Sequence, residues 1–232
     1  MTSTGKKRFT ILQVNVGRAK TAHDLLLAKA LALNADLIIV PEPNKNIVKK
    51  NGWITDTRSD VAIYINNKNM HINKVKRREG YLKINIDNLA IIACYISSNI
   101  NIEHYERQVE NIIDMSQNER DFIVAGDVNA KSILWGSPHN DRRGEIWNEW
   151  ISSADIVVLN NGEPTFVRGE SKSHIDVTLA SKNVAKKISG WDVLGENLFT
   201  HHRYIFYEIG VKVTHKGRKK NEFNKEKFKR NK

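Results

Sequence analysis

The chain has 232 residues, 40% of them hydrophobic, which is enough for one large domain or two small ones around a substantial core. Its longest apolar runs, at residues 37–40 and 89–94, are too short to cross a bilayer, and residues 1–8 lack the apolar segment of a secretory signal. We therefore expect no membrane partner. The single cysteine, Cys94, excludes an internal disulfide and suits a reducing compartment.

The net charge of +11 comes from the two ends of the chain. Residues 6–8 are all basic, and residues 212–232 contain ten basic and two acidic side chains, so the body between them is formally neutral. We expect a basic N-terminal extension at 1–8, a folded domain at 9–211 and a disordered basic tail at 212–232. The tail either binds a phosphate backbone or serves only as a linker to a following domain.

The first elements form a predicted crossover unit. The apolar positions predict a strand at residues 9–16, a helix at 19–33 and a buried strand at 36–40. Asn15 lies near the end of the first strand. Glu42 follows the second strand between two prolines, which favour extended backbone there, and the alternative for Glu42 is an acid in an exposed loop.

The middle of the chain predicts a mixture of strands and helices. Tyr95 closes one of these strands and is either an ordinary core tyrosine or a site residue. The basic run at 74–78 is predicted to be a solvated loop. The predicted strands cover residues 61–65, 81–86, 89–96 and 156–159, and the predicted helices cover residues 102–117 and 141–154.

The sequence FIVAGDVN, at residues 122–129, predicts a buried strand that ends in a glycine, an acid and an amide. Gly126 allows the backbone to approach a neighbour closely. Asp127 and Asn129 are two positions apart, so in extended backbone their side chains point to the same side. The alternative is an Asx turn, in which both side chains only cap local backbone.

The last third of the chain predicts a hairpin and a final strand. Residues 164–168 and 173–179 flank Gly169 and predict a hairpin with a polar, partly basic tip. His202 precedes the final strand, at residues 204–211. Because strands outnumber helices and hairpins mix with crossovers, we expect an α/β sandwich of mostly antiparallel or mixed sheets with helices outside.

Polar side chains recur at or near the ends of these strands, and this inventory suits hydrolysis of a phosphate ester. A hard divalent cation takes oxygen ligands such as Glu42 and polarises a phosphoryl oxygen. Asp127 or His202 can serve as the acid–base partner of a water, and amide or phenol groups can bind phosphoryl oxygens without adding repulsive charge. The residues concerned are Asn15, Glu42, Tyr95, Asp127, Asn129, Asp176 and His202.

The order of these motifs resembles the endonuclease/exonuclease/phosphatase superfamily, which includes deoxyribonuclease I and the abasic-site endonucleases. Within it, GDVNA followed by LWG, together with IDVTLA, looks most like the AP-endonuclease-like endonuclease domain of site-specific non-LTR retrotransposons. That domain is the N-terminal part of a polyprotein that also carries reverse transcriptase. The matching motifs are QVN ending at Asn15, VPE ending at Glu42, Tyr95, GDVN ending at Asn129, PTF around Thr165, HID ending at Asp176 and THH ending at His202.

The resemblance implies a four-layer α/β sandwich, with two mixed β-sheets face to face and helices outside. It implies a magnesium-dependent enzyme, with manganese as the alternative ion, that nicks one strand of double-stranded DNA in the nucleus. The nick would leave a 3′-hydroxyl that primes the reverse transcriptase domain of the same polyprotein.

The resemblance also assigns roles at the site. Glu42 would bind the metal, and Asp127 would activate the water or serve the leaving oxygen. Asn129 and Tyr95 would hold the scissile phosphate, and Asn15 would align its neighbours.

Two further roles follow from the same resemblance. Asp176 would hydrogen-bond His202 and set its tautomer. The predicted hairpin would enter a DNA groove, with Thr165, Arg168 and Lys172 near the DNA.

Two positions depart from the family pattern. Gly17 stands where the family usually has an acid, although the retrotransposon group often lacks it too. His201 stands where an acid near the metal is expected, and an imidazole is a poor magnesium ligand, so we expect weakened metal use or lowered turnover. The alternatives are a phosphatase of the same fold acting on a small or lipid phosphate, and a DNA-binding module with weakened catalysis.

Overall fold

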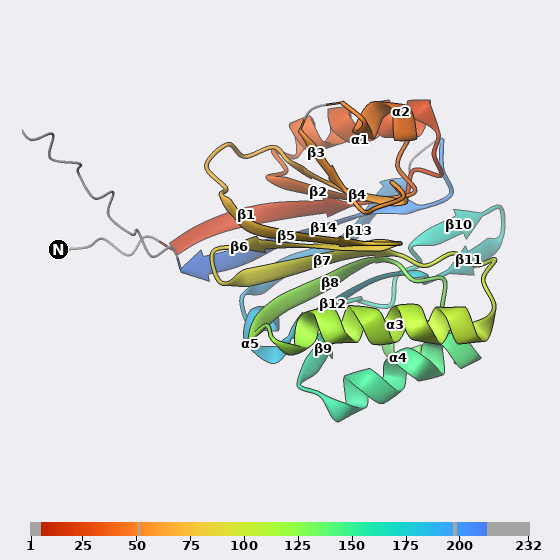
Figure 1. Ribbon diagram of the computed structural model, residues 1–232. Helices are drawn as coiled ribbons and strands as arrows, with labels where there is room; N and C mark the ends of the chain where they lie inside the picture. The colour runs from red at the N-terminus through yellow and green to blue at the C-terminus, as the bar shows by residue number, and fades with distance from the viewer. Residues whose placement is uncertain (1–5, 51, 197–198, 213–232) are drawn as a thin grey trace, which may run out of the picture.

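In the computed structural model, which describes residues 6–50, 52–196 and 199–212, two six-stranded sheets pack face to face. Helices cover both outer faces of this pair (Figure 1). The predicted four-layer sandwich with two mixed sheets is confirmed. The covering helices are α1 (Lys20–Ala32) and α2 (Lys45–Val48) over one sheet, and α3 (Ile102–Gln117) and α4 (Arg142–Ser153) over the other.

The first sheet contains both ends of the described chain. Its β1 and β2 run parallel and are joined by α1, as expected for the crossover unit, while its other pairings are antiparallel. The strand order is β13 (Ile188–Glu196), β14 (Arg203–Lys212), β1 (Lys6–Gln13), β2 (Leu37–Pro41), β4 (Val61–Ile65) and β3 (Trp53–Thr55).

The second sheet is built around the FIVAGDVN stretch. Its β7 and β8 run parallel and are joined by α3, and the remaining pairs are antiparallel. The strand order is β5 (Ile72–Arg78), β6 (Tyr81–Ile86), β7 (Leu89–Tyr95), β8 (Asp121–Asp127), β12 (Asp176–Ser181) and β9 (Ile156–Val158). The short helix α5 (Lys182–Ala185) follows β12.

Central strands are apolar on both faces because each face packs against a different core. In β8, Ile123 points into the core between the sheets, while Val124 packs under α3 and α4 together with Trp147. In β1, Ile11 joins the core between the sheets, while Leu12 packs under α1. Burial on both faces explains why these strands appear in the sequence as continuous apolar runs.

Three predicted elements differ from the structure. The basic run at 74–78 lies in β5, an edge strand paired with β6, and not in a loop; its Lys74 and Lys76 side chains are exposed. Charged side chains on an edge strand oppose pairing with other chains. β9 is a half-buried edge strand, not a buried one. The sequence pattern predicts no strand at β13, where shifts in register against β14 interrupt the alternation.

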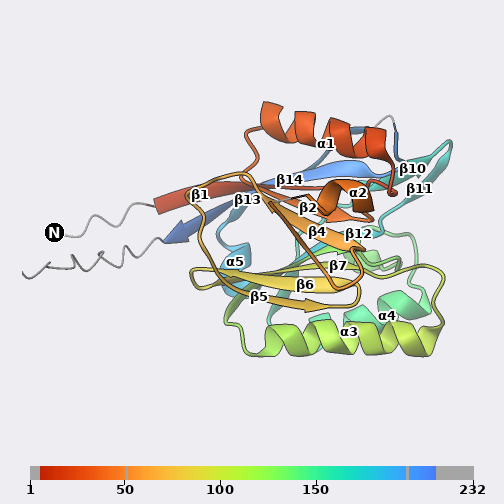
Figure 2. The same cartoon turned by 45° about the horizontal axis from the view of Figure 1, so that its top comes forward.

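The predicted hairpin is shorter than expected. Its arms are β10 (Phe166–Arg168) and β11 (Ser171–Ser173), which form a separate two-stranded ribbon. Asp176 belongs instead to β12, because that segment pairs with β8 in the second sheet. Figures 1 and 2 show the ribbon projecting beyond the two sheets at one end of the sandwich.

The proposed division of the chain at residues 8 and 211 stays a prediction. β1 begins at Lys6 and β14 ends at Lys212, so each strand extends slightly past the expected limits of the folded domain. Of the basic tail expected at 212–232, residues 213–232 lie outside the described part of the chain. Within the described part of the chain, no helix is long and apolar enough to span a bilayer.

Candidate active site

Four of the predicted site residues lie where parallel strands end. Asn15 and Glu42 follow the carboxyl ends of the parallel pair β1 and β2. Tyr95 and Asp127 are partners in register at the last positions of the parallel pair β7 and β8. Carboxyl ends of parallel neighbours meet at one edge of a sheet, which brings the members of each pair together. Because the two sheets face each other, both pairs meet at one rim of the sandwich.

The side-chain amide of Asn15 joins the two sheets at this rim. Its Nδ2 donates to Oε2 of Glu42 at 3.2 Å and to Oδ2 of Asp127 at 2.8 Å. Its Oδ1 accepts a hydrogen bond from the backbone N–H of Gly17 at 2.8 Å, which fixes the orientation of the amide. The fully buried amide therefore holds two carboxylates from different sheets side by side. This geometry fits the aligning role predicted for Asn15.

Glu42 does not have the extended backbone expected between its two prolines. Its φ of +44° lies in the left-handed region. Two backbone hydrogen bonds hold this conformation: the N–H of Glu42 donates to the carbonyl of Asp60 at 2.8 Å, and its carbonyl accepts from the N–H of Arg18 at 2.7 Å. The prediction was wrong because these tertiary contacts outweigh the local preference of a residue that precedes proline.

Asp127 and Asn129 form the Asx turn given as the alternative, and both side chains also line the cavity. Oδ1 of Asp127 accepts a hydrogen bond from the N–H of Asn129 at 3.1 Å. Asn129 lies beyond the end of β8 with φ +47°, so extended backbone is not what places the two side chains. The Nδ2 of Asn129 donates to the carbonyl of Ile96 at 3.0 Å, which ties its amide to the segment that follows β7.

The imidazole of His202 lies between two buried carboxylates. Asp176 begins β12 directly opposite Asp127 in β8. Its Oδ2 is 2.9 Å from Nδ1 of His202, and Nε2 of the same ring is 3.9 Å from Oδ2 of Asp127. The ring of Phe166 packs edge-on against the imidazole with centroids 4.9 Å apart. This is the arrangement expected if Asp176 orients His202.

The surroundings of Asp127 and His202 raise the pKa of both groups. Burial raises the pKa of Asp127, the charge of Asp176 raises it further, and the resulting pKa is about 7 although His202 and two hydrogen bonds oppose the shift. Burial alone would lower the pKa of His202, but the nearby carboxylates, first of all Asp176, outweigh burial and raise it to about 9. At neutral pH His202 is therefore protonated, while Asp127 can take up or release a proton.

Tyr95 is a cavity residue and not an ordinary core tyrosine. Its side chain is half-buried and lines the same space as Glu42. Burial and the adjacent Glu42 carboxylate raise the pKa of Tyr95 above the usual range of a phenol. Its hydroxyl therefore keeps its proton at neutral pH and remains a hydrogen-bond donor.

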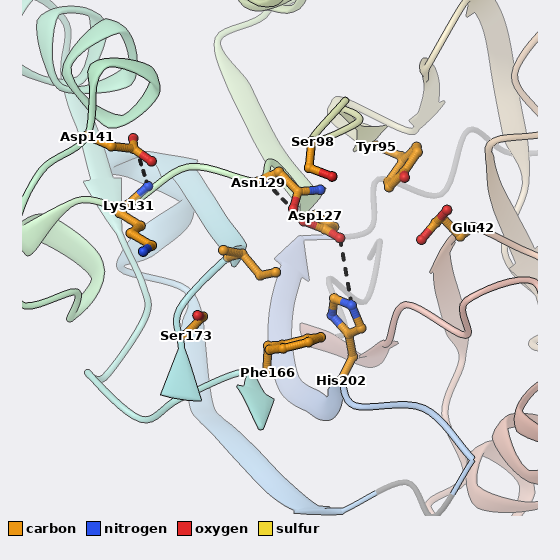
Figure 3. Close-up of a pocket in the computed structure, with 11 residues that line it drawn as sticks. Glu42, Tyr95, Ser98, Asp127, Asn129, Lys131, Asp141, Phe166, Ser173 and His202 are labelled. Carbon is orange, nitrogen blue, oxygen red and sulfur yellow. Dashed lines mark hydrogen bonds and ion pairs between the residues drawn. The ribbon is translucent and has the colours of Figure 1, made fainter. Parts of the chain in front are cut away.

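The site opens into a cavity of about 420 Å³ (Figure 3). Five predicted site residues line it, whereas Asn15 and Asp176 support them from behind. The predicted residues in the lining are Glu42, Tyr95, Asp127, Asn129 and His202.

Sequence reasoning missed the other lining residues, of which Lys131, Asp141 and Ser173 lie on the side away from Glu42 (Figure 3). Lys131 is two residues beyond Asn129, so its position in the chain offered a signal. The remaining positions follow from how the hairpin and α4 pack against the sheet, and no local pattern predicts them. The missed residues are Ser98, Lys131, Asp141, Phe166, Ser173 and Ile175.

The site can hold a metal ion. Donor atoms of Asp127, Asp176 and His202 lie within 4.8 Å of one another and are all buried. Oδ1 of Asp176 is a buried atom without a hydrogen-bond partner among the described residues, so this carboxylate has a free lone pair. Glu42 is not part of this group, but its carboxylate faces the same cavity and shares the Asn15 amide with Asp127.

The residues predicted to contact DNA have different surroundings. Arg168 and Lys172 are exposed on the hairpin. Thr165 is fully buried, and its Oγ1 accepts a hydrogen bond from the N–H of Asp176 at 3.1 Å, so it supports Asp176 and has no surface that DNA could touch. His201 is exposed, with its ring 5.7 Å from that of Phe166.

The hairpin is anchored beside the side chains that line the cavity. The N–H of Val167 donates to the carbonyl of His201 at 2.8 Å, and the N–H of Arg203 donates to the carbonyl of Thr165 at 2.7 Å. An isolated β-bridge joins Phe166 and His202. The hairpin therefore extends from the rim of the cavity.

Solved structures share this fold. The endonuclease domain of TRAS1, a telomere-specific non-LTR retrotransposon, superposes with a TM-score of 0.72 at 23% identity, covering 88% of this chain and 98% of that one. An AP endonuclease from Archaeoglobus fulgidus superposes with a TM-score of 0.66 at 11% identity, covering 86% and 98% of the two chains.

Sequence relatives point to the same group. A 115 kDa protein in the type-1 retrotransposable element R1DM of Drosophila melanogaster is 24% identical over 220 residues, covering 83% of this chain. The RNA-directed DNA polymerase from the mobile element jockey of the same species is 47% identical over 45 residues, or 19% of this chain. The aligned parts span only 21% and 5% of these two relatives.

The family assignment rests on a match to the sequence model of a family. The sequence model of the endonuclease-reverse transcriptase family matches residues 89–206, about half of the chain. The resemblance to the endonuclease domains of non-LTR retrotransposons, within the endonuclease/exonuclease/phosphatase superfamily, is confirmed. The chain belongs to the endonuclease-reverse transcriptase family.

Proposed function

We propose that this chain is a magnesium-dependent endonuclease domain that nicks one strand of a double-stranded DNA target. The observation that carries the proposal is the buried Asp176–His202 pair beside Asp127, at the edge of an open cavity. A carboxylate that can exchange a proton near neutral pH, next to a protonated imidazole, suits hydrolysis of a phosphodiester. Membership of the endonuclease-reverse transcriptase family supports DNA as the substrate.

The charges at the site suggest a division of labour. Asp127 takes a proton from the attacking water on its carboxylate. Protonated His202 faces the scissile phosphate with Nε2–H and offsets the negative charge that develops there. Tyr95 and the amide of Asn129 donate hydrogen bonds to phosphoryl oxygens. The water oxygen bonds to phosphorus as the bond between phosphorus and the 3′ oxygen breaks. The leaving oxygen takes up a proton from solvent and Asp127 releases its proton to solvent, which leaves a 5′-phosphate and a 3′-hydroxyl at the nick.

Glu42 and Asp127 are the residues that we expect to hold the cation. Magnesium prefers oxygen ligands, and the Asn15 amide already holds one oxygen of each carboxylate in the same region. With its pKa raised to about 9, His202 carries a proton on both ring nitrogens at neutral pH and offers no lone pair to a cation, so of the three clustered side chains it is the carboxylates that can bind metal. When bound, magnesium would polarise a phosphoryl oxygen and neutralise developing charge. Manganese is the alternative ion.

The relatives suggest what the nick is for. The jockey relative is described as an RNA-directed DNA polymerase, and this chain corresponds to a small part of its length. We infer that a reverse transcriptase domain of the same polyprotein extends the 3′-hydroxyl, so that the nick primes reverse transcription in the nucleus. Exposed Arg168 and Lys172 on the hairpin would contact the DNA beside the cut, where positive side chains bind phosphates.

Supercoiled plasmid offers a direct test of the proposal. We expect the chain to convert supercoiled plasmid to the nicked circle with magnesium, and to lose at least about 99% of that rate when EDTA removes the ion. The measurement is gel densitometry over time, with end-labelling of the nick to identify a 3′-hydroxyl. Release of phosphate from inositol phosphates without plasmid nicking would favour the phosphatase, and DNA binding without any nicking would favour the binding module.

The position of His201 gives a second prediction. If an acid at this place assists metal use, His201→Asp should raise the nicking rate about threefold or more, and should lower the magnesium concentration needed for half-maximal rate. His201→Asn is the matched control, because it has the same shape as aspartate without the charge. An unchanged rate in His201→Asp would mean that the missing acid has no importance here.

A further inference from the structure

Arg143, in the first turn of α4, is bound to the backbone of two loops that lie far from it in sequence. Its guanidinium donates to four carbonyl oxygens. The planar guanidinium of arginine carries several N–H donors in fixed directions and can bind several carbonyl oxygens at once. The ammonium group of lysine has no such planar arrangement. The four acceptors, with distances from Nη1 or Nη2, are Ser97 at 3.3 Å, Ser98 at 3.0 Å, Ile100 at 2.6 Å and Asn129 at 3.4 Å.

Two aromatic residues, Tyr105 and Trp147, support the guanidinium of Arg143. The guanidinium stacks over the ring of Tyr105, 4.7 Å from its centroid. The hydroxyl of Tyr105 donates to the carbonyl of Val128 at 2.7 Å and accepts from Nε1 of Trp147 at 2.8 Å. Tyr105 and Trp147 are fully buried, so this platform has little freedom to move. The Arg143 guanidinium is thereby held against a ring of α3 that is itself hydrogen-bonded to Trp147 of α4.

The two loops form one wall of the cavity. Residues 97–100 follow Tyr95 and contain Ser98, and the second loop contains Asn129 and Lys131. Asn129 has φ +47°, in the left-handed region that asparagine tolerates better than most residues, and its carbonyl accepts a hydrogen bond from Arg143. Arg143 does not line the cavity itself. It binds the loops from behind, on the side away from the substrate.

We propose that Arg143 is a positioning residue for phosphodiester hydrolysis. It fixes the loops that carry Asn129 and Ser98, so that these polar groups face the scissile phosphate beside Tyr95 and Asp127. This role rests on the proposed nuclease activity. Displacement of such groups by about 1 Å can cost about a hundredfold in rate, because polar groups stabilise a transition state only when they are held in place.

The test compares Arg143→Met with two control variants. Arg142→Met changes the adjacent exposed residue, whose side chain pairs with Glu145 at 3.2 Å. Lys83→Met removes a buried cation whose Nζ binds the carbonyl of Met115 at 2.9 Å and Oε1 of Glu119 at 2.6 Å, near the far end of α3. It therefore reports what loss of stability alone does to the rate.

Plasmid nicking should show a loss in kcat and not in KM. We expect kcat of Arg143→Met to fall about ten- to hundredfold while KM for DNA changes less than about twofold. Both control variants should keep kcat within about twofold of the parent. Arg143→Lys keeps the charge without the planar fork, so its kcat should stay below about one fifth of the parent value.

Hydrogen exchange gives a second readout that does not need activity. Amides in residues 97–100 and 128–131 should exchange about tenfold faster in Arg143→Met than in the parent, with no change in Arg142→Met. If the parent does not nick DNA, the proposed function fails, and exchange still tests whether Arg143 holds the loops. Unchanged exchange, a loss confined to KM, full kcat in Arg143→Lys, or an equal loss in Lys83→Met would each overturn the positioning role.

Discussion

Replacing Asp127 by asparagine is expected to lower the rate of plasmid nicking by at least about a thousandfold. The change keeps the size of the side chain and removes the charge and the ability to take up a proton. Asp127 is almost completely buried and has a pKa raised to about 7, so its ionised form is costly to the fold. The unfolding temperature of the variant should therefore equal or exceed that of the parent.

Asp121→Asn is the matched control for this prediction. Asp121 starts the strand that Asp127 ends, and its Oδ2 pairs with Nζ of Lys187 at 2.7 Å, remote from the cavity. The control should nick within about twofold of the parent rate. Retention of more than a tenth of the activity in Asp127→Asn would remove Asp127 from the proton-transfer role. A lowered unfolding temperature would show that its burial costs less than we infer.

Gly126→Ala is expected to reduce the free energy of unfolding by about 3 kcal/mol or more, since it forces atoms into a closely packed sheet. A Cβ built on Gly126 would lie 1.8 Å from the carbonyl oxygen of Cys94 and 2.7 Å from its carbonyl carbon. These are backbone atoms of β7, paired in register with Gly126, and they cannot move without opening the β7–β8 pair. The measurement is the midpoint and slope of urea unfolding.

Gly195→Ala, in β13, serves as the control for Gly126→Ala. A Cβ at Gly195 meets no atom within 4 Å, and the residue is exposed. Its effect should remain within about 0.5 kcal/mol. Equal urea midpoints for the two variants would mean that the β7–β8 pair can open by more than an ångström at little cost, which would contradict a rigid strand beneath Asp127.

The polar strand ends were predictable because they depend on local patterns. Short apolar runs that stop at Asn15, Tyr95 and Asp127 mark buried strands, and a buried strand that ends in a polar group suggests a site. The order of the motifs added the family, which the family match confirms. Asp176 was predicted for the site, but on the wrong element, since its pairing with β8 is a long-range contact.

Glu42 and Thr165 show where local reasoning fails. The backbone of Glu42 is decided by hydrogen bonds to Asp60 and Arg18, which are remote in sequence or in a different loop. Thr165 was expected at the DNA surface, but the bridge between Phe166 and His202 turns the base of the hairpin inward. Neither contact has a periodic signature, because each joins single residues and not whole elements.

Periodicity and residue types at fixed spacing were enough to predict which segments form the central strands and main helices, which polar groups end those strands, and the family. Long-range packing placed the Asn15 amide between carboxylates from two sheets, His202 between Asp127 and Asp176, and Arg143 behind the loops. These arrangements depend on how the two sheets and α4 pack, since folding brings together groups separated by long stretches of chain.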